Sequence, residues 1–212
     1  MDERGSQDHL LVMNNTPGSY SSRSPIGEYD QIVCDTCEQK FGPWDQYGIE
    51  LLRRINDGEG TPIKDLAVTV PVDYTVLKLF IMSMLWRANA SSRPMFTRVS
   101  IGGRWNDALT AALNQNDPRE AEIFSVSVAR FRENEEQRVT FDPHRERISG
   151  VNFTRFYVYG GYTFIIKVDQ RPTIDSFTEV MLRPDRDLCV LLRNWSPSER
   201  RVVQSIMADN RQ

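Results

Sequence analysis

The segment Tyr74–Ala90 places the strongest constraint on how this chain folds, because it is apolar on nearly every side. Its apolar residues include Val76, Leu77, Leu79, Phe80, Ile81, Met82, Met84, Leu85 and Trp86. Pro71 ends the preceding segment, and Asp73 is a typical helix N-cap residue. A helix that is apolar all round must be enclosed by the rest of the protein. We therefore predict a buried central helix, with Lys78 and Arg87 extending their charged ends to solvent.

Other helix and strand patterns follow one another in a clear order. Helices are predicted over residues 43–55, with Pro43 in the first turn, and over residues 103–114. The strongest strand pattern is a hairpin over residues 153–168 that turns at Gly160-Gly161. Shorter strands are predicted at residues 10–13, 28–34, 68–70, 123–131, 138–141 and 188–192. Ser196-Pro197-Ser198-Glu199 is a capping box that begins a terminal helix. The order predicts an α+β fold, with a helical N-terminal half, a C-terminal antiparallel sheet and a terminal helix.

The composition favours one large globular domain. A length of 212 residues with 40% hydrophobic residues suffices for a sizeable core. Residues 1–26 are poor in apolar side chains, so we expect a flexible N-terminal segment followed by a single α+β domain over residues 27–212. The net charge of -3 gives no overall argument for nucleic-acid binding. A signal peptide is not predicted and the longest apolar run is too short for a bilayer, so we expect a cytoplasmic protein without membrane contact.

Cys34 and Cys37, in the sequence Cys34-Asp35-Thr36-Cys37, are the candidate site residues. They lie between the strand predicted at 28–34 and the helix predicted from residue 43, and they would supply half of a tetrahedral zinc site. A dimer would complete the ligand set. Three interpretations stay open: a zinc knuckle, two small thiols packed at a turn, and a redox pair, which would follow the first strand of a βαβ unit. Zinc is thus the one cofactor that the sequence suggests.

The resemblance of this chain to a known family rests on three segments. Residues 27–47 (GEYDQIVCDTCEQKFGPWDQY) resemble the second half of a treble-clef zinc finger, with a Phe-x-x-Trp-x-x-Tyr pattern after the cysteine pair. Residues 77–88 (LKLFIMSMLWRA) and 157–164 (YVYGGYTF) are similar to the central helix and C-terminal hairpin of the same proteins. These are uncharacterised bacterial and phage proteins related to HNH endonucleases. The resemblance implies a half treble-clef-like knuckle over residues 29–55, with Cys34 and Cys37 as metal ligands, and a gene carried by a phage or mobile element.

The first zinc-ligand pair and the catalytic histidine segment of HNH endonucleases have no counterpart here. The stretch before Cys34 contains no cysteine and only one histidine, His9. Nuclease chemistry of this kind needs a histidine general base and a metal held against the phosphate. The other histidine, His144, lies in a polar run that predicts a solvated hairpin loop. We therefore expect a non-catalytic binding protein that acts on a host or defence protein. The alternative is a metal-dependent HNH-like nuclease, or its remnant, that acts on nucleic acid.

Overall fold

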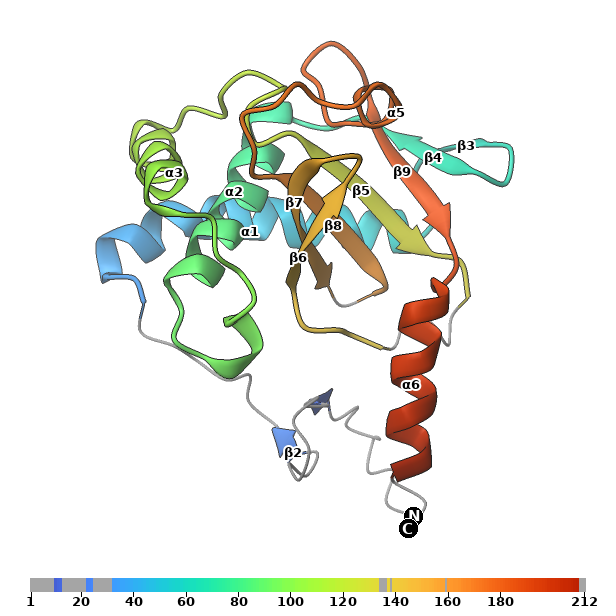
Figure 1. Cartoon of the computed structure of the whole chain (residues 1–212). Helices are drawn as coiled ribbons and strands as arrows, with labels where there is room; N and C mark the ends of the chain where they lie inside the picture. Colours follow the sequence, from blue (N-terminus) through green and yellow to red (C-terminus); the bar gives the residue numbers. More distant parts are fainter. Residues whose placement is uncertain are drawn as a thin grey trace, which may run out of the picture.

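A computed structural model describes residues 10–12, 22–24, 32–133, 137, 139–158 and 160–209. Its centre is a seven-stranded sheet with the strand order β3-β4-β9-β5-β8-β7-β6 (Figure 1). These strands are β3 (Thr61–Ile63), β4 (Ala67–Val70), β5 (Val126–Phe131), β6 (His144–Ile148), β7 (Val151–Val158), β8 (Tyr162–Lys167) and β9 (Leu188–Arg193). Neighbouring strands are antiparallel, except that β5 and β9 are parallel. A separate ribbon joins β1 (Leu10–Val12) to β2 (Ser22–Ser24), which confirms a strand at the predicted first position. The fold is α+β.

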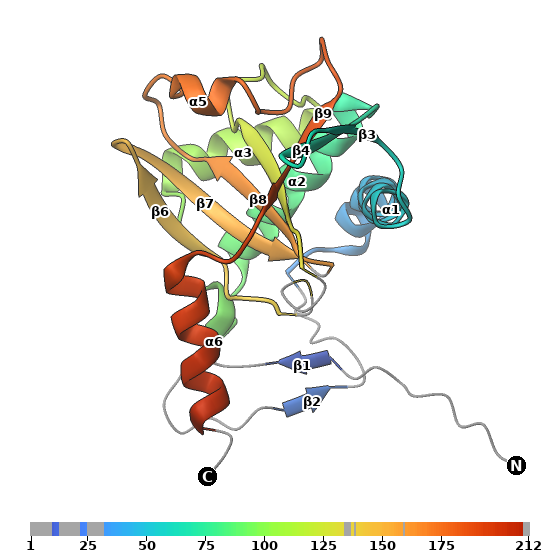
Figure 2. The same cartoon turned by 90° about the vertical axis from the view of Figure 1, so that its right-hand side faces the viewer.

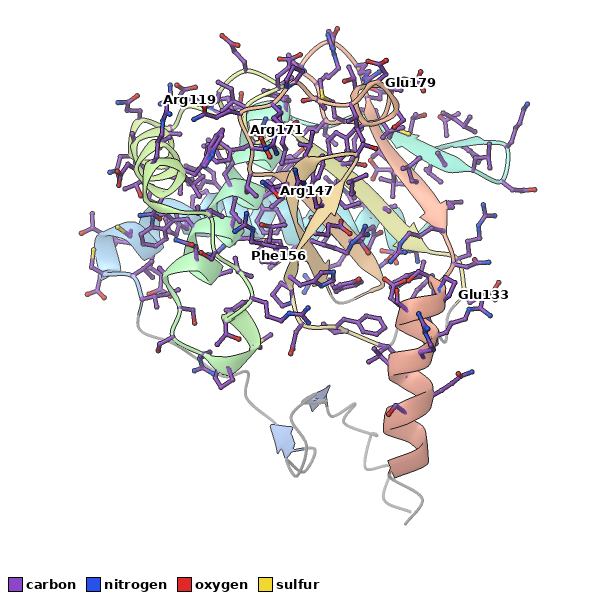
Figure 3. The ribbon with its side chains drawn as sticks, in the orientation of Figure 1. Arg119, Glu133, Arg147, Phe156, Arg171 and Glu179 are labelled. Carbon is purple, nitrogen blue, oxygen red and sulfur yellow. The ribbon has the colours of Figure 1, made fainter. Side chains whose placement is uncertain are left out.

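Three helices pack on one face of the sheet: α1 (Asp35–Asn56), α2 (Tyr74–Ala90) and α3 (Gly103–Gln115) (Figure 2). The ring of Phe80 on α2 meets the ring of Phe164 on β8 edge to face, with centroids 6.2 Å apart. The Tyr162 hydroxyl on β8 donates to the carbonyl of Leu52 on α1, at 3.1 Å. The side chains between the sheet and these helices form the main core, which includes the buried Phe156 of β7 (labelled in Figure 3). The predictions of a buried central helix and of its Asp73 cap are confirmed, since Asp73 accepts a hydrogen bond from the Val76 N–H.

The predicted exposure of Lys78 is wrong. Its side chain is fully buried, because the segment around Glu120 covers the side of α2 on which Lys78 lies. Its Nζ lies 3.4 Å from the Tyr74 hydroxyl and 3.4 Å from the Glu120 carbonyl oxygen. Arg87 is half-buried and forms a two-pronged ion pair with Asp45 on α1, at 2.6 and 2.8 Å. Both cations of α2 therefore point to protein partners rather than to bulk water.

Helix α1 begins eight residues earlier than predicted, at Asp35, and Pro43 lies inside it. Its buried face already includes Phe41 and Trp44, so packing against the core stabilises the first turns. Pro43 is exposed, and water can therefore solvate the carbonyl that its missing N–H leaves without a helical partner. The strand predicted at 28–34 is wrong for Ile32–Cys34, which lie outside any strand, while residues 28–31 fall outside the described residues.

The sheet also differs from the prediction at two places. The described residues of the strand predicted at 138–141 lie in irregular backbone, and β6 lies instead at His144–Ile148, where a hairpin loop was predicted. Strand β6 has polar residues on both faces, so it lacks the alternation of apolar and polar residues by which a strand is predicted. In addition, β3 and β4 of the N-terminal half join the sheet, so it is not confined to the C-terminal half. The short helices η1 (Pro94–Phe96) and α5 (Asp175–Thr178) were not predicted.

The second face of the sheet is covered in two separate places. Helix α5 lies over a small apolar cluster in which Phe153 of β7 contacts Phe177. Helix α6 (Pro197–Asp209) starts at the other end of the strands and extends beyond the sheet in both views (Figures 1 and 2). Its predicted capping box is confirmed, because the Ser196 N–H donates to Glu199 and the Glu199 N–H donates to the Ser196 hydroxyl. Within the described part of the chain, every helix is too short or too polar to cross a lipid bilayer.

Candidate functional site

A pocket of about 660 Å³ opens on the second face of the sheet, beside α6. We call it the α6 pocket. It is lined by Pro94, Thr97, Arg98, Val139, Thr140, Phe141, Asp142, His144, Glu146, Arg155, Tyr157, Arg193, Ser196, Ser198, Glu199, Val202 and Val203. Its volume falls within the range of pockets that take a small molecule or the anchor residues of a partner. The lining residues come from the strands β6, β7 and β9, from the segment around η1 in the helical half, from the loop before β6 and from the start of α6.

The two-residue period of the strands explains which side chains reach this pocket. On β7, Val151 and Phe153 point to the second face under α5, and Arg155 and Tyr157 continue the same face into the pocket. Phe156 points to the opposite face and packs in the main core. Because the register pairs His144 with Arg155, the even-numbered residues of β6 lie on the same face of the sheet as the odd-numbered residues of β7. A strand that is apolar on one face thus presents charged groups on part of the other.

Glu199 is the most highly connected charged group of the pocket. The Arg193 guanidinium forms two hydrogen bonds with its carboxylate, the Tyr157 hydroxyl donates to it at 2.8 Å, and the Ser196 N–H donates at 2.6 Å. Burial opposes the charged carboxylate, but these donors, led by Arg193, outweigh it and lower the pKa of Glu199 to about 2. Burial and the negative Glu199 together raise the pKa of Tyr157. Glu199 is therefore held as an anion that fixes the start of α6 to the sheet.

Glu146 and Arg155 form a second internal ion pair. The Arg155 Nη2 lies 2.7 Å from the Glu146 Oε1, and the two side chains are 14% and 22% exposed. They lie on the adjacent strands β6 and β7, one diagonal step apart in the register. The two opposite charges of this pair balance each other within the pocket lining.

Arg98 and Asp142 remain outside these internal pairs. Among the described residues, neither the Asp142 carboxylate nor the Arg98 guanidinium has a hydrogen-bond or ion-pair partner. Burial raises the pKa of Asp142, and the charge of Arg98 opposes that effect. The His144 Nδ1 lies 3.3 Å from the Asp142 carbonyl oxygen, and its ring stacks on Tyr157 with centroids 6.0 Å apart. The pocket thus offers one carboxylate, one guanidinium and one imidazole beside aromatic surface.

The candidate metal ligands lie elsewhere, in the first turn of α1. Cys34 is the N-cap residue and is exposed, whereas Cys37 is half-buried against the core. The Cys37 backbone N–H, followed by the Cys37 thiol, favours the thiolate of Cys34 and lowers its pKa. The same thiol contact, together with burial, raises the pKa of Cys37. The two sulfurs are therefore neighbours with unlike character.

Further ligands do not join this cysteine pair in the part of the chain that the structure describes. Groups of three or more His, Cys, Asp or Glu side chains that could hold a metal ion are absent from that part. His144 lies in the α6 pocket, Cys189 lies half-buried on β9, and His9 falls outside the described residues. Cys34 and Cys37 would hold zinc only with ligands from another molecule or from residues not described.

Comparisons of the chain with protein-family models, with curated proteins and with solved structures found no match. The sequence alone singled out His144 but placed it in a surface loop, and it missed Asp142, Arg98 and the Glu146–Arg155 pair. If residues 144–148 had been read as a strand, the two-residue spacing of His144 and Glu146 would have placed both side chains on the same face.

Proposed function

We propose that this protein is a non-catalytic binding protein that takes a segment of a protein partner into the α6 pocket. The observation that carries the proposal is the state of the pocket's charges. Glu199 and Glu146 are occupied by Arg193 and Arg155, so they organise the walls and are not positioned to exchange protons with a substrate. A concave, preformed surface with its walls already paired is suited to recognition.

The composition of the pocket favours a protein partner. Protein interfaces are enriched in aromatic residues and arginine, and their strongest contacts fill pockets near the centre of the interface. The rings of Phe141 and Tyr157 lie 4.9 Å apart at the pocket wall, and Val202 and Val203 of α6 add apolar surface. Aromatic and aliphatic walls of this kind accommodate an apolar anchor side chain from the partner.

The remaining charges indicate what surrounds that anchor. Asp142 would pair with a basic side chain of the partner, and Arg98 with an acidic one. Asp142 and Arg98 attract each other electrostatically, but neither forms a hydrogen bond or an ion pair within the described chain. Each can therefore form a charge-assisted hydrogen bond to a partner without breaking one. The sequence-based expectation of a host or defence protein as partner, and of a phage or mobile-element gene, belongs to this proposal.

Affinity purification with a matched pair of variants tests the proposal. The tagged full chain is used as bait in a lysate of the organism that carries the gene, as wild type, Arg98→Glu and Arg145→Glu. Arg145 is exposed on β6 but occupies the strand position that points away from the pocket, so it controls for the change of charge. We expect a partner retained by the wild type and by Arg145→Glu, and at least about tenfold weaker retention by Arg98→Glu, equivalent to about 1.4 kcal/mol. Equal retention by all three proteins would contradict docking in the α6 pocket.

The nuclease alternative is tested in parallel on the same protein. Purified wild type is analysed for zinc per chain and incubated with plasmid DNA in Mg²⁺ or Mn²⁺. Metal-dependent nicking that Cys34→Ser abolishes would replace the binding proposal with the nuclease, because the knuckle would then be needed for activity. The binding proposal expects intact plasmid under all these conditions.

A further inference from the structure

The first turn of α1 brings two thiols together in a fixed arrangement. Cys34 is the N-cap residue and Cys37 is the third residue of the helix, and the Glu38 N–H donates to the Cys34 carbonyl at 3.0 Å to close the turn. The N–H groups of a first turn have no acceptor within the helix, and the Cys34 side chain lies at this end of α1 without forming a cap hydrogen bond. Since the helix starts at Asp35 and not at residue 43, Cys34 lies at its N-cap and Cys37 lies in its first turn.

The two thiols differ in how far they can be reached from solvent. Cys34 is exposed, whereas Cys37 is half-buried and packs with Val33 against the main core. A reagent in solution therefore reaches the Cys34 sulfur more easily than the Cys37 sulfur, which lies three residues further along the chain. An exposed thiol at a helix N-terminus with a second, shielded thiol three residues on is the arrangement that supports thiol–disulfide exchange.

We propose that Cys34 and Cys37 form a redox-active dithiol that is oxidised by small organic disulfides. The Cys34 thiolate attacks one sulfur of the disulfide R–S–S–R, which forms a Cys34–S–S–R bond, breaks the R–S–S–R bond and releases one thiolate that is protonated to RSH. Cys37 then loses its proton and attacks the Cys34 sulfur, which forms the Cys34–Cys37 disulfide and releases the second RSH. The dithiol gives up two electrons and two protons, and the organic disulfide is reduced to two thiols.

Cys189 provides an internal reference for this chemistry. It lies on β9 and is half-buried, and burial raises the pKa of its thiol. A neighbouring thiol is absent, since in the described chain the other cysteines lie on α1. Cys189 should therefore react slowly and should give at most a mixed disulfide that nothing resolves.

The test uses glutathione disulfide as the probe on the full-length chain, after its zinc content has been measured. Wild type, Cys34→Ser, Cys37→Ser and Cys189→Ser are incubated with the probe, quenched with an alkylating reagent and analysed by peptide mass spectrometry. We expect wild type and Cys189→Ser to form the Cys34–Cys37 disulfide. Cys37→Ser should accumulate glutathione on Cys34, at a rate at least about tenfold above that of Cys189 in the same molecules. Cys34→Ser should lose this fast reaction.

Three results would overturn the proposal. One is a wild type that forms no Cys34–Cys37 disulfide while its thiols remain open to alkylation. Another is a Cys34 that reacts no faster than Cys189. The third is stoichiometric zinc that Cys34→Ser releases and that protects both thiols from the probe, because the pair would then be a metal site. Circular dichroism of each variant confirms that the comparisons concern folded protein. The outcome does not depend on the α6 pocket.

Discussion

Replacing Lys78 with methionine should stabilise this protein near neutral pH, although Lys78 makes hydrogen bonds. Its side chain is 0% exposed and lies between Tyr74 and the Glu120 carbonyl, at 3.4 Å from each. Burial lowers the pKa of Lys78 from 10.5 to about 7, and the charge of Glu122 opposes this effect only in part. Methionine keeps an unbranched side chain of similar length and removes the proton equilibrium.

The magnitude follows from the two pKa values. A folded pKa of about 7 against an unfolded pKa of 10.5 corresponds to a penalty of about 5 kcal/mol when the lysine is fully protonated in both states, and to about 4 kcal/mol at pH 7. The Lys78→Met variant escapes this penalty but leaves the Glu120 carbonyl without its donor, which costs about 1–3 kcal/mol. We therefore expect a net gain of about 1–3 kcal/mol at pH 7.

The pH dependence distinguishes this mechanism from improved packing. Because the folded pKa lies below the unfolded one, the unfolded chain binds more protons between pH 7 and 10.5, and wild-type stability should rise with pH across that window. Between pH 6 and 9 the wild type should gain about 3 kcal/mol relative to Lys78→Met. Urea denaturation followed by tryptophan fluorescence measures both proteins, with Lys64→Met, a change at an exposed lysine, as the control. A Lys78→Met variant that is less stable at every pH and has the wild-type pH slope would refute the reasoning, since Lys78 would then be charged and well paired.

Two further predictions concern the α6 pocket and the main core. Glu199→Gln should lower the free energy of unfolding by about 3 kcal/mol at pH 7, because it leaves the half-buried Arg193 without its counter-charge. The folded pKa of Glu199, about 2, lies below the ordinary 4.5, so the stability that this group gives the wild type should be lost as pH falls from 4.5 through 2. Urea titrations that show no such loss would contradict this prediction. Phe80→Ala should lower the free energy of unfolding by about 3–5 kcal/mol, because Phe80 is 5% exposed, contacts Phe164 and fills the space above Gly48. An unchanged melting temperature in calorimetry would show that Phe80 contributes little to the core.

The sequence by itself determined those elements whose signals are local and strong. The helix Tyr74–Ala90 is apolar throughout and carries its own Asp73 cap, and the Ser196–Glu199 capping box satisfies its N–H groups with neighbours in the chain. The hairpin at Gly160-Gly161 combines alternating strands with two glycines at positive φ, a conformation that glycine adopts freely. In each case a few adjacent residues supply the hydrogen bonds or the apolar surface that decide the local structure, so the α+β class could be predicted from them.

The tertiary structure decided the elements that depend on distant partners. The early start of α1 requires a core against which Phe41 and Trp44 can pack, and the burial of Lys78 requires the turn at Glu120 to cover α2. Strand β6 exists because β7 offers it a register, and its own alternation of polar residues gives no sign of which face is enclosed. The α6 pocket is assembled from segments up to about a hundred residues apart. The differing exposure of Cys34 and Cys37 arises because Cys37 packs against the main core. The cysteine pair itself could be found in the sequence, but the α6 pocket and the unequal exposure of the two thiols depend on long-range packing, which no short stretch of sequence encodes.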